Sequence, residues 1–365
     1  MSAPRPEVSP ARPPARPARP AAVSEVRTAV RRFLVAHCTG KSVAVACSGG
    51  ADSLALAAAT AHCASRLGLA VHGLVVDHRL QPDSAQVAHT AAATLRGFDV
   101  TTVRVLQVTV DGPGGLEAAA RRARYAALRA AAPPGALVLL GHTLDDQAET
   151  VLLGLGRGSG PRSVAGMREL DPPWGRPLLG LRRAVTAAAC AALSLTPWAD
   201  PHNTDSRFRR VRLRTEVLPL LEDVLGRGVA EALARTAVQV QEDLDVLEEQ
   251  AQVLLDSALA VPPPPHSPLP DSAPPDSALP EPVPAGSVLA GSGALQADVL
   301  HRAPAPLRRR ALRRWLLAAG VPQLTDAQLR AADNLIGRWS GQGAVWLPGD
   351  VRLHRAHGRL VLVSA

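Results

Sequence analysis

Residues 45–54 read VACSGGADSL, in which an apolar strand runs into two glycines and two serines and then into an alanine-rich helix. Glycines let the backbone turn sharply and bring N–H groups towards an anion, and a helix N-terminus adds a positive end. The serine hydroxyls can donate to phosphate oxygens, and Asp52 can hold a magnesium ion or orient a nucleophile. The stretch therefore predicts a phosphate-binding loop. An ordinary strand-to-helix turn with Ser and Asp as caps is the alternative.

The nearby triplet Gly40-Lys41-Ser42 imitates the end of a Walker A motif, Gly-x4-Gly-Lys-Ser/Thr, which follows a strand. Val35 stands where the first glycine belongs, and the triplet precedes its strand. We therefore expect Gly40 to end a helix and Lys41 to open the strand.

Short apolar strands alternate with alanine-rich helices around the loop. This order predicts an α/β fold with an open parallel sheet covered by helices on both faces. Ligands of such sheets bind outside the carboxyl ends of the strands, so polar clusters that follow strands are the site candidates. The predicted strands are 43–47, 71–76, 100–105 and 137–140, and the predicted helices are 52–67, 84–96, 116–131 and 145–153.

The composition of the chain shifts along its length and predicts its organisation. Proline and arginine dominate the start, and proline alone forbids regular structure in a later stretch. We predict a disordered tail over 1–22, a catalytic domain over 23–227, a long helix over 228–260, a flexible proline-rich insert over 261–298 and a smaller, mainly helical C-terminal region over 299–365.

The net charge is +8, and it is almost entirely arginine because Lys41 is the only lysine. An arginine excess is compatible with a polyanionic partner, and a coding bias towards Arg, Ala, Pro and Gly explains it equally well. The four cysteines form no CxxC pair, which speaks against a zinc ribbon or redox dithiol. No apolar run is long enough to span a membrane, so we expect a cytoplasmic protein without membrane contact.

Further polar stretches follow the loop in a fixed order. They resemble, together with SGGADS, the tRNA(Ile)-lysidine synthetase family, which belongs to the N-type ATP pyrophosphatases with their SGGxDS loop. The resemblance covers roughly residues 25–225 well and the C-terminal region loosely. The stretches are VDHRL (76–80), GLEAAARRARY (115–125), GHTLDDQAET (141–150), RPLL (176–179), DPHN (200–203) and RRVRLR (209–214).

The resemblance implies a fold like that of the adenine nucleotide alpha-hydrolases and a ligase reaction. ATP, with Mg²⁺, would adenylate the wobble cytidine of the CAU anticodon of tRNA(Ile). Pyrophosphate would leave in that step. Free L-lysine would then attack C2, so that AMP leaves and lysidine forms. The implied partners are tRNA(Ile) and lysine, with a homodimer as a further possibility. The implied ATP ligands are Ser48, Gly49, Gly50, Ala51, Asp52, Ser53, Asp77 and His78, with Asp52 also the candidate for Mg²⁺.

Two carboxylates of the predicted helix 145–153, Asp146 and Glu149, are three residues apart and share one face, while Asp145 lies one position off it. Paired carboxylates suit capture of the lysine ammonium and removal of its proton. Acidic residues also collect at helix N-termini for dipole reasons alone, which is the plainer alternative.

Arginines supply the remaining candidates. Arg121 and Arg124 would face together and clamp a phosphate or the lysine carboxylate, unless they belong to a solvated basic face. Arg209 is the predicted active-site arginine of the run 207–214, in which Arg210 replaces the asparagine that is usual in the family and Thr143 replaces a second histidine. The predicted catalytic set is Asp52, Asp146, Glu149, Arg121 and Arg209, and the predicted lysine or tRNA contacts are Arg124, Asp145, Arg212, Arg214, Arg309 and Arg313.

Arg309 and Arg313 belong to APLRRRALRRWLL, which predicts either a tRNA-contacting surface or an ordinary amphipathic helix with a basic outer face. Two other functions remain open. A tRNA thiolase with a similar loop would need catalytic or cluster-binding cysteines. A non-catalytic nucleotide-binding protein would not need Asp52, Asp146 and Glu149.

Overall fold

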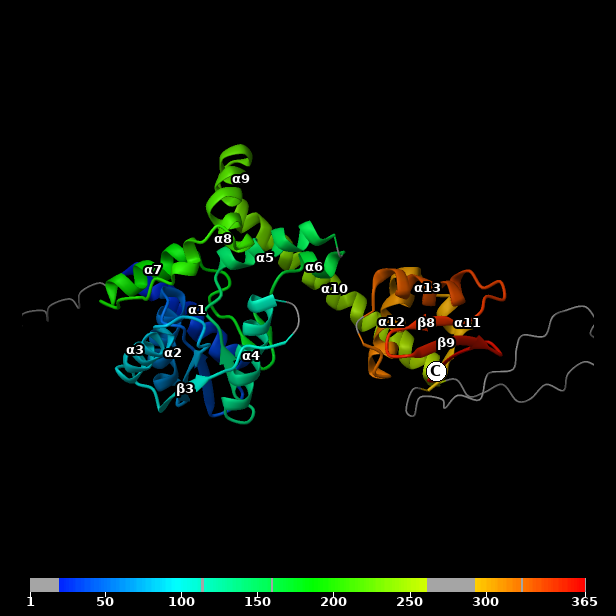
Figure 1. The fold of residues 1–365 in the computed structure, drawn as a ribbon, viewed down its shortest axis with the longest axis horizontal. Coiled ribbons are helices and arrows are strands. Elements are labelled where there is room, and N and C mark those ends of the chain that lie inside the picture. Colours follow the sequence, from blue (N-terminus) through cyan, green and yellow to red (C-terminus); the bar gives the residue numbers. More distant parts are fainter. Residues whose placement is uncertain (1–19, 113–114, 159, 261–292, 323, 365) are drawn as a thin grey trace, which may run out of the picture. The chain divides into compact units, whose positions relative to one another are not determined.

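The computed structural model describes residues 20–364 except 113–114, 159, 261–292 and 323 (Figure 1). The chain forms two compact units, one ending at Gln241 and the other beginning at Glu242. Most of the predicted tail and of the predicted proline-rich insert lies outside the described residues.

The first unit is built on a six-stranded sheet of order β3-β2-β1-β4-β6-β5. All neighbours are parallel except β5 and β6, which form a short antiparallel hairpin at the edge. This confirms the predicted open parallel sheet. The strands are β1 Ser42–Ala46, β2 Ala70–Asp77, β3 Thr102–Gln107, β4 Leu137–Leu139, β5 Leu170–Asp171 and β6 Trp174–Gly175.

Alternate residues of the central strands face opposite helical layers, because successive strand side chains point to opposite sides. Val43 and Val45 of β1 belong to one core cluster, with residues of α1, α2, α3 and α7. Ala44, between them, packs instead with Leu128 of α4. The helices concerned are α1 Ala21–His37, α2 Ala51–Leu67, α3 Ser84–Arg96, α4 Gly115–Ala131 and α7 Arg183–Ala192.

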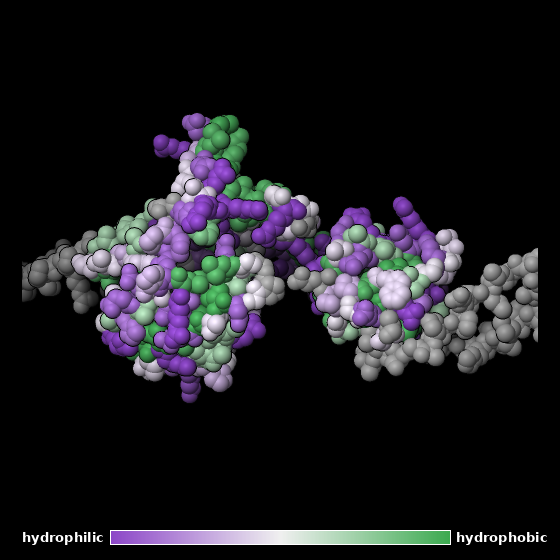
Figure 2. All heavy atoms as spheres, in the orientation of Figure 1, coloured by the Kyte–Doolittle hydropathy of each residue, from purple (hydrophilic) through white to green (hydrophobic). Residues whose placement is uncertain are grey.

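A helical layer formed by α5, α9 and the start of α10 completes this unit. Leu144 and Ala148 of α5 pack against Leu218 and Ala230, which brings the segment before α9 beside α5. α9 also exposes apolar side chains of its own, which form the green tip in Figure 2. The elements are α5 Leu144–Arg157, α6 Pro161–Val164, η1 Pro201–Thr204, α8 Arg209–Arg212, the π-helical turn η2 Leu213–Val217, α9 Leu218–Leu225 and α10 Val229–Ala260.

The second unit combines helices with a four-stranded antiparallel sheet of order β7-β10-β9-β8. After α10, its next described element begins at Leu295, inside the range predicted for the flexible insert. The sequence predicts a mainly helical region here, and the structure adds this sheet of four short strands to its helices. The elements are β7 Leu295–Gln296, α11 Ala297–His301, α12 Ala305–Ala318, α13 Asp326–Gly337, β8 Val345–Leu347, β9 Val351–Ala356 and β10 Arg359–Ser364.

One face of this second sheet is the core of the unit. Leu353, Leu360 and Leu362 have no exposed surface and pack with Leu312 and Leu316 of α12. In the described part of the chain, no helix has both the length and the hydropathy that a membrane span requires.

Candidate active site

The loop that opened the sequence analysis lies between β1 and α2, at the carboxyl end of a central strand. Gly49 has φ +85°, a left-handed conformation that side chains disfavour. The Ser53 hydroxyl donates to the Gly50 carbonyl over 2.9 Å and accepts from the Ser48 N–H over 3.1 Å. Ser53 therefore organises the loop from within, while the Ser48 side chain, in contact with it at 3.3 Å, lies nearer the surface.

Two other segments hold the loop in place. The Trp198 N–H donates to the Gly49 carbonyl over 2.9 Å, so this carbonyl oxygen is already hydrogen-bonded within the protein. Gly141, which follows β4, packs so closely that a Cβ there would lie 3.0 Å from the Ser53 nitrogen. Gln81, which follows β2, contacts the segment after Trp198: its amide nitrogen lies 2.7 Å from Nδ1 of His202 and 3.4 Å from Oδ1 of Asp200.

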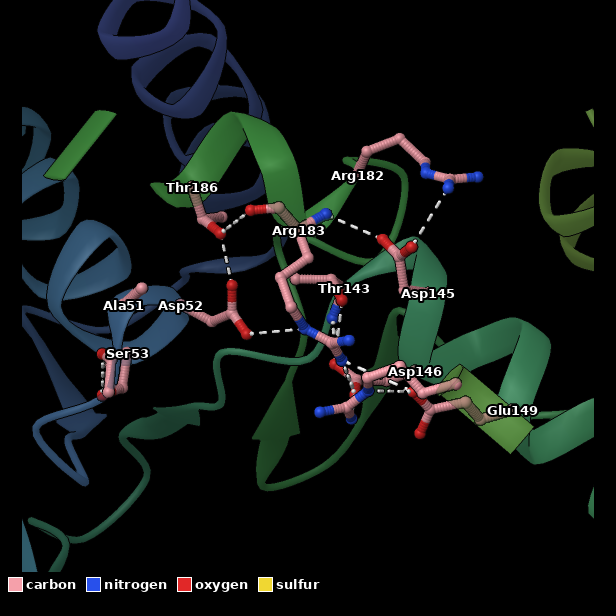
Figure 3. Close-up of polar contacts among 12 residues, drawn as sticks. Ala51, Asp52, Ser53, Thr143, Asp145, Asp146, Glu149, Arg182, Arg183 and Thr186 are labelled. Atoms are coloured by element: carbon pink, nitrogen blue, oxygen red, sulfur yellow. Dashed lines mark hydrogen bonds and ion pairs between the residues drawn. The ribbon is translucent and has the colours of Figure 1, made fainter. Parts of the chain in front are cut away.

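Asp52 stands in the first turn of α2, directly after the loop. Its carboxylate accepts a hydrogen bond from the Thr186 hydroxyl and lies 3.4 Å from Nε of Arg183 (Figure 3). Burial raises the pKa of Asp52, and these two partners only partly oppose the shift. Burial therefore disfavours the ionised form of Asp52, which lies beside a potential phosphate site.

Arg183, at the start of α7, connects Asp52 to the carboxylates of α5. Its Nη2 donates to Asp146 over 2.6 Å and lies 3.6 Å from Glu149, while its backbone N–H donates to Asp145 over 2.7 Å. Figure 3 shows its side chain reaching from α7 between Asp52 and Asp146. Burial disfavours the guanidinium charge, but the surrounding carboxylates outweigh burial and raise the pKa of Arg183.

Asp146 is held in its ionised form by the same arrangement. Burial alone would favour the neutral acid, but the Arg183 charge and hydrogen bonds from Thr143 outweigh it and lower the pKa of Asp146. Thr143 donates from both its backbone N–H, over 2.8 Å, and its hydroxyl, over 2.9 Å. Thr143, where the family resemblance leads one to expect histidine, is therefore a partner of the carboxylate.

Glu149 has no exposed side-chain surface and lies among arginines from two segments. Nε of Arg214, in the π-helical turn, donates to it over 2.9 Å, and Nη1 of Arg210 lies 3.6 Å away. The structure thus brings together Asp52, Asp146 and Glu149, as the sequence predicts.

The arginines of the run 207–214 differ in their surroundings, and of the neighbours Arg209 and Arg210 it is Arg210 that reaches Glu149. Arg210, whose role the sequence leaves in doubt, reaches Glu149, whereas Arg209 is exposed. Arg212 is also exposed and pairs with Glu216 one turn later over 2.8 Å. Asp145 is bound by the Arg183 backbone and by the Arg182 side chain at 3.3 Å, so it fastens α7 to α5.

Arg121 and Arg124 both pack on Tyr125, with their guanidinium carbons 4.7 and 5.6 Å from its ring centroid. They face together, as predicted. Burial, with the Arg121 charge, lowers the pKa of Arg124.

Two histidines follow β2 and β4, the strands on either side of β1. His78 and His142 each have a buried Nδ1 without a hydrogen-bond partner in the described residues. Burial lowers the pKa of His142 to about 3 and also lowers the pKa of His78, so both rings are neutral at pH 7. Asp77, predicted to bind ATP, is buried and accepts from the Arg79 N–H over 3.0 Å.

The basic helix α12 of the second unit uses most of its arginines for packing. Arg308 pairs with Asp333, and Arg310 and Arg314 pair with Glu248 of α10. Arg309 and Arg313, the predicted tRNA contacts, are half-buried, and Arg309 donates to the Ala305 carbonyl of its own helix. The alternative of an ordinary amphipathic helix therefore accounts for much of this arginine content.

Sequence reasoning missed Arg182, Arg183 and Thr186. A signal was present, because Arg182 is the N-cap of α7 and Arg183 its first residue. A helix N-terminus carries partial positive charge, so two adjacent cations there need nearby carboxylates to stabilise them.

The comparisons with known proteins agree with this geometry. The model of the PP-loop domain matches residues 23–221, and that of the TilS substrate binding domain matches residues 295–361. The chain is 53% identical to the tRNA(Ile)-lysidine synthase of Mycolicibacterium paratuberculosis, over 90% of this chain and 92% of the relative. It is 51% identical to that of Rhodococcus erythropolis, over 93% of this chain and 95% of the relative.

One solved structure shares the fold at low sequence identity. A U34-tRNA thiolase from Methanococcus maripaludis aligns with a TM-score of 0.51 and 17% identity, over 60% of this chain and 80% of that one. This likeness supports the sheet topology and nothing about the acceptor.

Proposed function

Because the chain belongs to the tRNA(Ile)-lysidine synthase family, we propose that it uses ATP to join free L-lysine to C2 of the wobble cytidine in the CAU anticodon of tRNA(Ile). The observation that carries the proposal is Arg183, whose guanidinium joins Asp52 beside the loop to Asp146 on α5. A nucleotide site and an amine-binding carboxylate thus share one charged group.

The first half of the reaction needs phosphate charge to be neutralised. Amides of the loop 48–53 and the N-terminus of α2 would hold the pyrophosphate end of ATP. The C2 carbonyl oxygen of the cytidine then bonds to the α-phosphorus while the bond to pyrophosphate breaks. Arg121 and Arg124 would stabilise charge on the phosphates, the role for which Arg forks are suited.

Magnesium fits this site through one or two carboxylates and the substrate phosphates, which is its usual mode of binding. Asp52 is the candidate ligand, and the described residues contain no cluster of three metal-ligating side chains. When bound, the ion would supply positive charge to the leaving pyrophosphate.

The second half needs an amine to be captured and deprotonated. Asp146, kept ionised by its neighbours, would bind the lysine ammonium, with Glu149 beside it. Once one of these carboxylates has taken a proton from the ammonium, the ε-nitrogen bonds to C2, the C2–O bond breaks, and AMP leaves with that oxygen. Neutral His78 and His142 would line the crevice without adding charge.

A thiolase reaction is less compatible with the cysteines. Cys47 precedes the loop but is buried, and burial raises its thiol pKa, as it raises that of Cys190 to about 11. A reactive cysteine needs the opposite shift, because the thiolate is the nucleophile.

The test is incorporation of radiolabelled lysine into a tRNA(Ile) transcript with a CAU anticodon, in the presence of ATP and Mg²⁺. We expect lysine in the tRNA and one AMP per lysine. A transcript with uridine at the wobble position is the matched control and should accept none. Adenylation of a different acceptor without lysine incorporation would contradict the proposal.

A further inference from the structure

One face of α7 contacts the first turn of α2. Arg183, Thr186 and Cys190 are three and four residues apart, so they share a face of α7. The thiol of Cys190 donates to the Ala51 carbonyl over 3.2 Å. The hydroxyl of Thr186 donates to Oδ1 of Asp52 (Figure 3). The first turn of α2 is therefore bound by α7 both through its backbone and through the Asp52 side chain.

Each oxygen of the Asp52 carboxylate has its own donor on α7. Thr186 donates to Oδ1, and Nε of Arg183 lies 3.4 Å from Oδ2. Because the two donors stand on one helix, three residues apart, they fix both the rotamer and the plane of the carboxylate. An ionised carboxylate accepts at about four lone-pair positions, so other positions stay available to a ligand.

Of these two donors, Thr186 is the one that serves Asp52 alone. The guanidinium of Arg183 is shared, because its Nη2 lies 2.6 Å from Asp146 and 3.6 Å from Glu149. In the described part of the chain, the Thr186 hydroxyl bonds to no carboxylate other than Asp52. If Arg183 moves towards Asp146, Thr186 still holds Asp52.

The Thr186 hydroxyl also has a second acceptor, so its bond to Asp52 can open at little cost. Thr186 has no exposed surface, and its hydroxyl oxygen lies 2.7 Å from the Arg183 carbonyl one turn earlier. A hydroxyl carries one proton, and an ionised carboxylate is the stronger acceptor, so the proton goes to Asp52. If a cation takes Oδ1, the hydroxyl turns to the carbonyl and no buried donor loses its partner.

We infer that Thr186 is a positioning residue for the nucleotide half of the reaction, and that its hydroxyl holds Asp52 in the orientation that receives ATP with its magnesium ion. The inference rests on the proposed function for the role of Asp52. Thr186 acts through Asp52 rather than on a reacting atom. Loss of a group that orients a metal-binding side chain lowers metal affinity or activity about ten- to a hundredfold.

The helix α2 supplies a matched control. Thr60 is also a helical threonine without exposed surface, and its hydroxyl donates to the Leu56 carbonyl over 2.8 Å. Both hydroxyls thus have an acceptor in their own helix, and only that of Thr186 also reaches a carboxylate. Thr186→Val and Thr60→Val each keep the branched shape of the side chain and remove the hydroxyl.

The experiment measures binding of ATP to the full chain by calorimetry in the presence of Mg²⁺, without tRNA or lysine. We expect Thr186→Val to lose about tenfold in affinity, and Thr186→Ser, which keeps the hydroxyl, to recover most of that loss. Thr60→Val should bind as the native protein does. A crystal structure of metal-free Thr186→Val should show Asp52 in more than one rotamer.

Either native ATP affinity or an unchanged Asp52 rotamer in Thr186→Val overturns the inference. An equal loss of affinity in Thr60→Val also overturns it, because the effect would then belong to buried helical hydroxyls in general. If Thr186→Val does not fold, native affinity in Thr186→Ala overturns the inference. ATP binding does not depend on the acceptor, so a native protein that binds ATP but incorporates no lysine refutes the proposed function and leaves this result readable.

Discussion

Nε of Arg214 lies 2.9 Å from Oε1 of Glu149, a carboxylate with no exposed side-chain surface. The arginine comes from a π-helical turn, a local distortion that is frequent at functional sites. The turn therefore brings a cation from the segment after α8 onto the face of α5 that carries the predicted lysine-binding carboxylates.

This contact predicts an order of importance within one short run of arginines. Arg214→Ala removes the direct partner of Glu149, so we expect kcat/KM for lysine to fall about a hundredfold, the usual cost of losing one charge-stabilising donor. Arg209→Ala alters an exposed neighbour and should reduce kcat/KM for lysine less than tenfold. Steady-state kinetics at saturating ATP and tRNA measure kcat/KM for lysine in both variants. Equal losses would support the predicted active-site role of Arg209.

A second prediction concerns the shape of the Arg183 side chain. Arg183→Lys keeps the charge but removes the planar fork that reaches both Asp52 and Asp146. We expect lysidine formation to slow about a hundredfold. Arg182→Lys is the control, because Arg182 is the adjacent residue and pairs with Asp145 and Glu231 outside the shared contact. Comparable activity of the two lysine variants would show that charge alone suffices.

The opposite pKa shifts of two carboxylates predict opposite effects on stability. The pKa of Asp146 is lowered, so its charge stabilises the fold above the unfolded-state pKa of about 3.9, and this is lost as pH falls through the folded pKa. The pKa of Asp52 is raised, so its charge costs stability above the folded pKa, and the cost disappears as pH falls below the unfolded value.

Asp146→Asn should therefore lower the free energy of unfolding at pH 7, and Asp52→Asn should raise it. Urea unfolding in metal-free buffer, repeated at acidic pH, tests this: both differences should shrink as pH falls. Changes of the same sign in both variants would contradict the assignment. Asp52→Asn should also abolish pyrophosphate release, a gain of stability at the expense of activity.

Gly141 gives a purely steric prediction. Its Cβ would stand 3.0 Å from backbone atoms of both Asp52 and Ser53. Gly141→Ala should destabilise the fold by about 1–3 kcal/mol and raise KM for ATP, because the start of α2 must move. Gly156→Ala, where no atom lies within 4 Å, is the matched control. Thermal unfolding and ATP titration distinguish the two.

The features that could be predicted from the sequence are those that depend on short local patterns of residues. Short apolar strands revealed the parallel sheet, and the rule of strand carboxyl ends placed Ser48, Asp77 and His142 at one edge. Helical spacing alone put Asp146 and Glu149 on one face. Each of these inferences needs residues that lie close together along the chain.

What sequence reasoning could not reach depends on contacts between distant segments. Arg183 lies 131 residues from Asp52 in the chain, so their pairing exists only in the folded protein. The same holds for Arg308 and Asp333, whose buried pair removes one arginine from a surface that the sequence suggests is basic. Arg210 likewise gains its partner only because the segment before α9 packs beside α5.

The sharing of Arg183 between Asp52 and Asp146 has a consequence for the order of events. A triphosphate that attracts this guanidinium leaves Asp146 with less compensating charge, and an incoming ammonium supplies what is missing. ATP and lysine should then bind with positive heterotropic cooperativity, and linkage requires that each raises the affinity of the other by the same factor. Free lysine would gain its binding site chiefly when the nucleotide that activates the acceptor is already present.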